Sequence, residues 1–277
     1  MRLALILWLC WTGLQARGQY YFQDIVVARQ AAEQFGLLKK HKINTVTVQS
    51  FEADDSPIEN FSLLQRVNAA QNQLVTQSKT DYTGKSELTT TYNPLGMPVS
   101  MVDSTNTTVV KTTYEYDAQG RLVAVHSHSY DEGQLYVAEE DHLFTYNAQG
   151  HPTQMLRIKR PGNDTLRVVF VPADNGKPGE EQWWRGGRKT ETWYYYYDED
   201  NNLTDIARYN ARAKAIIPDY LFEYDEDNRL GKQTTVVAGS SDYRIWYYAY
   251  DDRGLKTGEI ILNKQQEVLG KTKYTYR

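Results

Sequence analysis

The chain has 277 residues, of which 40% are hydrophobic and 24% are charged, and its formal net charge is −4 at pH 7. This length is enough to bury a substantial core. A helical membrane protein is excluded, because no segment after residue 18 has the ~20 consecutive apolar residues that span a bilayer. The slightly acidic balance gives no support to a nucleic-acid partner.

Residues 1–18 have the three-part pattern of a secretory signal peptide. A short basic start is followed by an apolar run and by small residues around a predicted cleavage site between Gly18 and Gln19. The pattern predicts export to the periplasm, the outer-membrane surface or the medium. A buried N-terminal helix and lipid attachment at Cys10 are the alternatives, and Leu9 disfavours the second because lipoprotein signals have a small residue there. Cys10 is the only cysteine, so the predicted mature chain has no disulfide.

Residues 19–57 form a predicted cap made of one helix and a first strand. Asp24 is a candidate N-terminal capping residue, and the apolar residues after it follow helical spacing as far as Lys40. From Ile43 the apolar residues alternate with a period of two, which is typical of a β-strand. We expect the helix to cover the first edge strand of a sheet.

Residues 58–277 contain repeated copies of a short motif, in which Tyr is followed by Asp or Asn and, at the fifth position, by Gly or Asn. One degenerate copy has Pro172 in the Tyr position. The copies recur about every 26 residues between Val67 and Tyr276. The fifth positions of seven copies are Gly96, Gly120, Gly150, Gly176, Asn201, Asn228 and Gly254. Gly and Asn tolerate a positive φ, so each copy predicts a tight turn between two strands.

The fold that follows is all-β. We predict a curved antiparallel meander of about eight hairpin repeats of ~26 residues, with about sixteen strands and one N-terminal helix. In most copies an aromatic residue stands two positions before the Tyr. Residues two apart in a strand face the same side, so two rings are expected on one face of each copy.

The blocks YEYDAQGRL, YDEDNNL and YDEDNRL resemble the YD repeat of the RHS family, over about residues 60–277. In that family the repeats form a long spiralling antiparallel sheet, which in large members encloses a toxic C-terminal domain. About eight repeats are too few to close such a shell by this analogy, and the chain ends within a repeat. The resemblance therefore implies the repeat architecture and not the toxin function, and the chain is similar to small exported YD-repeat proteins of Bacteroidetes-type bacteria.

The sequence contains no catalytic motif such as G-x-S-x-G, a phosphate-binding glycine loop or H-E-x-x-H. We therefore predict no catalytic residues, no metal and no cofactor. His126, His128 and His142 could hold zinc, and the acidic turns at Asp198 and Asp225 could suggest calcium. Exposed strand histidines and turn capping explain these residues more simply.

The candidate ligand-binding residues are aromatic side chains with arginines near them. They are Trp183, Trp184, Trp193, Trp246 and Arg244, with Arg185 and Arg188 close in sequence. Such residues dominate binding surfaces, although cross-strand pairs that stabilise the sheet would use the same residue types. We predict a non-catalytic exported scaffold of the cell envelope or medium that presents a surface to a protein or glycan. The alternative is an envelope carbohydrate-active enzyme that uses carboxylates on the sheet face.

Overall fold

The computed structural model describes residues 20–81, 84–131, 133, 135, 137–237 and 240–277. The predicted signal peptide lies outside the described residues. Within these ranges, no helix combines the length and apolar character needed to cross a membrane.

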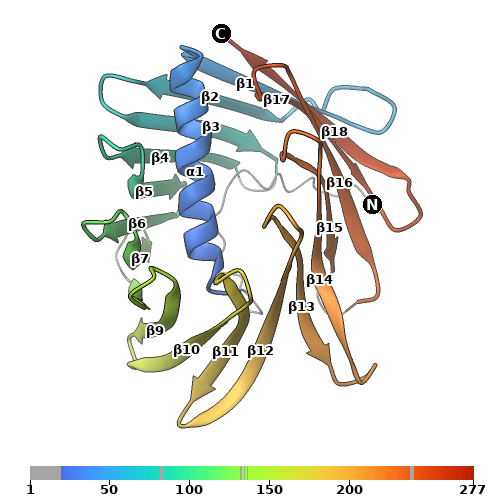
Figure 1. Ribbon diagram of the computed structural model, residues 1–277. Coiled ribbons are helices and arrows are strands. Elements are labelled where there is room, and N and C mark those ends of the chain that lie inside the picture. Colours follow the sequence, from blue (N-terminus) through green and yellow to red (C-terminus); the bar gives the residue numbers. More distant parts are fainter. Residues whose placement is uncertain (1–19, 82–83, 132, 134, 136, 238–239) are drawn as a thin grey trace.

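One helix precedes eighteen strands along the described chain (Figure 1). The elements are α1 (Gln23–Lys40), β1 (Thr45–Phe51), β2 (Ser62–Asn68), β3 (Gln73–Thr80), β4 (Gly84–Tyr92), β5 (Pro98–Thr105), β6 (Thr108–Tyr116), β7 (Leu122–Asp131), β8 (Val137–Tyr146), β9 (Pro152–Arg160), β10 (Asp164–Pro172), β11 (Pro178–Arg185), β12 (Arg188–Tyr197), β13 (Leu203–Asn210), β14 (Ala215–Tyr224), β15 (Leu230–Val236), β16 (Tyr243–Tyr250), β17 (Lys256–Leu262) and β18 (Val268–Tyr276). The all-β prediction with one N-terminal helix is confirmed.

The sheet closes on itself. Each strand pairs antiparallel with the next one, and β18 pairs back with β1, in a register that runs from Val46 opposite Tyr276 to Phe51 opposite Lys271. The predicted curved meander of eight 26-residue hairpins is therefore wrong in its description of the sheet: strands of 7 to 10 residues form one closed barrel. Closure depends on the pairing of the two ends of the chain, and a repeat period contains no information on that pairing.

The motif turns lie together at one end of the barrel and share one geometry. The seven fifth-position residues all have positive φ, between 58° at Asn228 and 85° at Gly150. In the turn that begins at Asp117, the Gly120 N–H donates to the Asp117 carbonyl over 2.9 Å. The Asp117 carboxylate accepts from the backbone N–H groups of Gln119 and Arg121. The carboxylate therefore accepts hydrogen bonds from N–H groups that have no backbone acceptor in a tight turn.

Most motif tyrosines also connect one repeat to the preceding one. Six hydroxyl groups donate to a backbone carbonyl at the start of the preceding return strand, over 2.6 to 2.9 Å. The donor and acceptor pairs are Tyr116 with Pro98, Tyr146 with Leu122, Tyr197 with Pro178, Tyr224 with Leu203, Tyr250 with Leu230, and Tyr276 with Lys256. The repeated tyrosine thus joins neighbouring hairpins by a side-chain hydrogen bond, in addition to the backbone hydrogen bonds between their strands.

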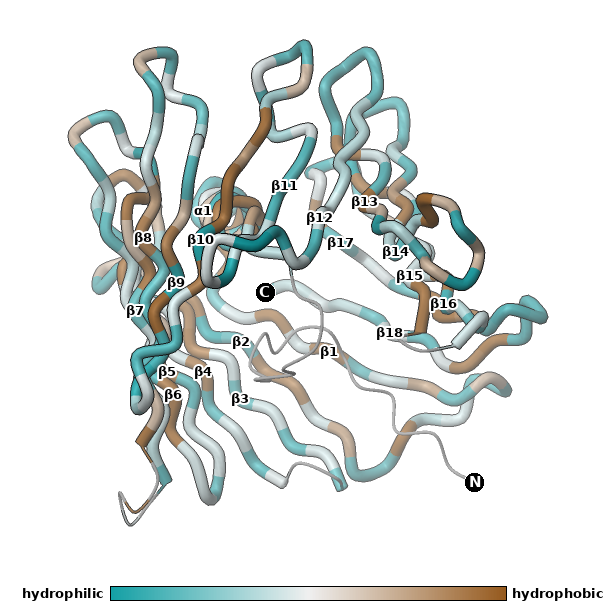
Figure 2. The backbone as a smooth tube through the Cα atoms, turned by 90° about the horizontal axis from the view of Figure 1, so that it is seen from below, coloured by the Kyte–Doolittle hydropathy of each residue, from teal (hydrophilic) through white to brown (hydrophobic). Residues whose placement is uncertain are grey.

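Helix α1 packs against the inner face of the sheet, and the strands lie around it (Figures 1 and 2). Its N-terminal part joins a core cluster with β7 to β13 that includes Phe144, Phe170 and Trp193. Its C-terminal part joins a second cluster, in which Phe35 stacks on Tyr92 with ring centroids 3.8 Å apart. The expectation that the helix covers an edge strand is wrong, because the closed sheet has no edge to cover.

Candidate functional site

The N-terminus of α1 is held by one buried carboxylate, Glu181 of β11. Its oxygens accept from the backbone N–H groups of Tyr21 and Phe22, both over 2.8 Å. They also accept from the Trp183 indole and the Tyr195 hydroxyl, both over 2.6 Å. Burial raises the pKa of Glu181, and these four donors oppose that effect. Glu181 thus supplies, from a strand, acceptors for the two backbone N–H groups directly before the first helical turn, and its negative charge lies at the N-terminal end of the helix.

A second contact joins the first turn of α1 to β8. His142 Nδ1 lies 2.5 Å from an Asp24 oxygen, and its Nε2 lies 2.7 Å from Glu140, which also pairs with Lys159 over 3.0 Å. Burial alone would lower the pKa of His142, but the two carboxylates outweigh it and raise the pKa to about 9. Burial would raise the pKa of Glu140, but His142 and Lys159 lower it to about 2. Asp24 is therefore an ion-pair partner and not the helix cap that the sequence suggested.

The acidic side chains of the neighbouring inner wall are also paired with cations. Arg157 donates to Asp164 over 2.5 Å, and Arg185 pairs with the same carboxylate over 2.8 Å. Arg208 bridges Glu191 and Asp219 over 2.9 and 2.6 Å. These carboxylates hold the wall together, so the arrangement does not favour the alternative in which sheet-face acids perform glycoside hydrolysis.

The structure separates the predicted binding residues between the two faces of the sheet. Trp193 has no exposed surface, and Trp183 lies beside it under Tyr21. Trp246 is 8% exposed, and it shares the inner face of β16 with the half-buried Arg244. Trp184 lies on the outer face, 5.6 Å from the Arg167 guanidinium. The five residues do not form one surface.

The three histidines considered for zinc do not converge. His126 pairs with Asp141 over 2.7 Å and His128 lies 3.4 Å from Glu139, whereas His142 faces α1 on the inner side. Among the residues that the structure describes, no group of three or more His, Cys, Asp or Glu side chains is arranged to hold a metal ion.

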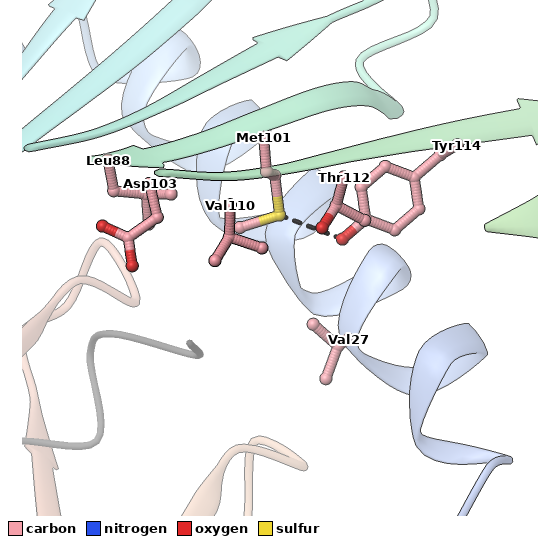
Figure 3. Close-up of a pocket in the computed structure, with 7 residues that line it drawn as sticks. All are labelled: Val27, Leu88, Met101, Asp103, Val110, Thr112 and Tyr114. Carbon is pink, nitrogen blue, oxygen red and sulfur yellow. Dashed lines mark hydrogen bonds between the residues drawn. The ribbon is translucent and has the colours of Figure 1, made fainter. Parts of the chain in front are cut away.

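A small cavity lies beside the helix. A cavity of about 40 Å³ lies between Val27 of α1 and strands β4 to β6 (Figure 3). It is lined by Leu88, Met101, Asp103, Val110, Thr112 and Tyr114. Sites for small molecules usually need about 300 Å³ or more, so this cavity has room for water and not for a sugar ring. A wider, open hollow of about 590 Å³ lies over polar residues of β2 to β5.

Exposed aromatic and aliphatic side chains gather on the outer face of β12 to β17. Tyr196 is 48% exposed, Tyr209 59% and Tyr247 44%. Tyr247 stands directly opposite Ile260, and Tyr209 opposite Ile216. We call this surface the outer aromatic face. The sequence prediction placed aromatic rings on both faces of these strands, but it named the tryptophans and not these tyrosines as binding residues. The sequence pattern that identifies the outward-facing tyrosines is the alternation within the aromatic runs 193–197 and 246–250, since every second residue of a strand faces outward.

Comparisons with known proteins support the repeat assignment. Residues 92–132, which span β4 to β7, match the RHS Repeat family model. The chain therefore carries an RHS repeat, and the resemblance to the YD/RHS family is confirmed. No curated protein matches the chain.

The solved structures that are similar to this chain include two toxin complexes and a porin-like protein. The Photorhabdus luminescens Tc holotoxin pore with a TccC3 mutation has 14% identity and a TM-score of 0.34, over 79% of this chain and 12% of that chain. The TcdB2-TccC3-Cdc42 structure has 16% identity and a TM-score of 0.34, over 75% and 12%. A porin-like protein from Bacteroides uniformis ATCC 8492 has 12% identity and a TM-score of 0.42, over 85% and 96%. The chain thus spans about an eighth of the length of the first two.

Proposed function

We propose that this chain is a non-catalytic exported scaffold, placed in the cell envelope or secreted, that presents the outer aromatic face to a glycan or a protein. The observation that carries the proposal is the half-exposure of Tyr196 on β12, Tyr209 on β13 and Tyr247 on β16, all on the outer face of one sheet. Apolar side chains gathered on a surface in this way mark interaction sites. Export rests on the leader pattern of residues 1–18.

Polar neighbours make the outer aromatic face suited to a glycan. Tyr196 stands opposite Asp205, and Tyr247 stands opposite Lys232, which pairs with Glu223 over 2.6 Å. A sugar ring has C–H groups on its faces and hydroxyl groups around its edge. Tyrosine rings match the faces, and carboxylates and ammonium groups match the hydroxyls.

The non-catalytic part of the proposal rests on the inner wall. Asp24, Glu140, Asp164, Glu191 and Asp219 each have a cationic partner within 3.0 Å. A glycosidase needs one carboxyl group that protonates the leaving group and a second that acts on the sugar. The first needs a raised pKa, whereas a cationic partner lowers the pKa of a carboxyl group.

A glycan array followed by titration calorimetry tests the proposal. We expect Tyr196→Ala and Tyr247→Ala each to weaken binding of the best array ligand about tenfold, because truncation of a central aromatic contact typically costs 1 kcal/mol or more. Leu143→Ala is the matched control, because Leu143 is also exposed but lies on β8. Unchanged binding in both tyrosine variants, with wild-type melting temperatures, would refute the outer aromatic face as the binding surface.

A further inference from the structure

Two adjacent hairpin tips concentrate positive charge. The β11–β12 tip carries Arg185, Arg188 and Lys189, and the β13–β14 tip carries Arg212 and Lys214. All five side chains are exposed, and no acidic residue occurs in 185–189 or 210–215. Since β12 pairs with β13, the two tips are neighbours. We call these five residues the basic rim.

The charges of the basic rim differ from those of the motif turns at the other end of the barrel. There, Asp117 pairs with Arg121, Asp225 with Arg229, and Asp251 with Arg253. In the basic rim, Arg185 pairs with Asp164 over 2.8 Å. Arg188, Lys189, Arg212 and Lys214 form no ion pair with any residue that the structure describes.

The positive charge of the basic rim is a local feature, since the whole chain has a net charge of −4. Like charges on neighbouring tips repel each other, so the arrangement disfavours the free protein slightly and favours an anionic ligand. Arginine pairs with carboxylate, sulfate or phosphate groups through two parallel hydrogen bonds, and lysine acts as a point charge.

The basic rim is continuous with the outer aromatic face. Tyr209 and Ile216 form a cross-strand pair at the base of the β13–β14 tip, next to Arg212 and Lys214. Trp184 stands one residue before Arg185, and Arg167 lies over its ring. A ligand held by the cations would therefore meet ring faces within the same site, which suits a charged sugar polymer better than an isolated anion.

We propose that the basic rim binds an anionic glycan, whose carboxylate or sulfate groups pair with Arg188, Lys189, Arg212 and Lys214 while its sugar rings lie against Tyr209. This inference rests on the proposed function and names the class of glycan. Because the contacts are exposed ion pairs, the affinity should fall steeply as the salt concentration rises.

Polygalacturonate and its fully methyl-esterified form are suitable probes, because they share a backbone and differ in charge. We expect the full chain to bind polygalacturonate and to bind the ester at least about tenfold more weakly, since the ester removes the charge-assisted bonds. The double variant Arg188→Glu with Lys214→Glu should lower the affinity for polygalacturonate by about tenfold or more. Lys111→Glu, a single charge reversal on β6, should leave it within about twofold.

Several outcomes would overturn the inference. If the double variant folds normally and binds polygalacturonate as tightly as wild type does, the basic rim is not the site. If the ester binds as well as the acid through Tyr247, the anionic preference fails while the proposed function stands. Binding to single-stranded DNA or to phosphatidylserine vesicles with equal affinity and equal salt dependence would mean general attraction to polyanions and would overturn the glycan assignment. If no glycan binds, this inference and the glycan-binding part of the proposed function both fail.

Discussion

At the scale of single residues, the motif tyrosine makes contacts in two directions. Its hydroxyl donates to the preceding repeat, as Tyr250 does to Leu230. Its ring can also accept a cation from the preceding turn: the Arg229 guanidinium lies 5.1 Å from the Tyr250 ring centroid. Phenylalanine would keep the ring contact and lose the hydrogen bond, which explains why the motif position uses tyrosine.

We expect Tyr250→Phe to lower the free energy of unfolding by about 1 kcal/mol, because the partly buried Leu230 carbonyl loses its side-chain donor. Tyr196→Phe is the control, since Tyr196 is exposed, and it should change stability by less than about 0.5 kcal/mol. Urea denaturation measures both. Equal stability of the two variants would contradict the role assigned to the hydroxyl.

The residue scale also shows where sequence reasoning succeeds. The positive φ of Asn201 and Gly254 has a local cause, because a tight turn needs a residue that adopts left-handed angles. The burial of Trp193 and the role of Glu181 depend on a helix that lies far away in the sequence. An acid in a strand looks like a surface residue until its partners, the N–H groups of Tyr21 and Phe22, are in place.

At the scale of elements, α1 is fastened to the inner wall by polar contacts at its first turn and by apolar packing along its length. Sequence periodicity predicted the helix, and α1 indeed ends at Lys40. It did not predict the position of the helix, because amphipathic spacing shows that one side is buried without showing against what. The ion pair of His142 with Asp24 joins segments that are 118 residues apart.

The pKa of His142 gives this contact a defined pH dependence. A histidine whose folded pKa is raised to about 9 contributes stability that is complete below its unfolded pKa of 6.5 and is lost as the pH rises through 9. The contribution is on the order of 3 kcal/mol. We expect the difference in unfolding free energy between wild type and His142→Gln to be largest near pH 6 and to shrink between about pH 7 and 10.

Chemical denaturation across this pH range measures the difference, and subtracting the variant removes the contribution of other titrating groups. At acidic pH the dependence of stability on pH has the opposite sign, because stability then falls as the pH falls. Glu140, with its pKa lowered to about 2, contributes stability above its unfolded value of 4.5 and loses it as the pH falls toward 2. A wild-type to variant difference that stays constant from pH 6 to 10 would contradict the ion-pair assignment.

At the scale of the whole molecule, closure of the sheet determines what is buried. A sheet of this many strands curls as its twist accumulates, and closing it removes both exposed edges. A closed sheet of eighteen strands encloses more space than side chains alone fill. Helix α1, together with Tyr20 and Phe22, occupies part of that space.

The repeat pattern describes how each hairpin joins the next, which is why the antiparallel order of the strands was predictable. It does not state how many strands complete the circle. That number depends on the strand tilt and stagger summed over the sheet and on β1, whose sequence does not carry the motif. The outer aromatic face could not be predicted for a related reason. The direction of the strands was known, but without knowledge of closure either face of the sheet could contact a ligand.

The most direct test of this account is a disulfide between β1 and β18. Gln49 and Lys273 are exposed and stand opposite each other in the register of these two strands, at a Cα separation of about 4.5 to 5.5 Å that a disulfide can bridge. In a chain with Cys10→Ser, we predict that Gln49→Cys and Lys273→Cys form an intramolecular disulfide under mild oxidation, detected by mass spectrometry and by faster migration on a non-reducing gel. The pair Gln49→Cys and Lys111→Cys, with its second cysteine on β6, should stay reduced. A folded protein in which the first pair also stays reduced would show that β1 and β18 do not meet and that the sheet is open.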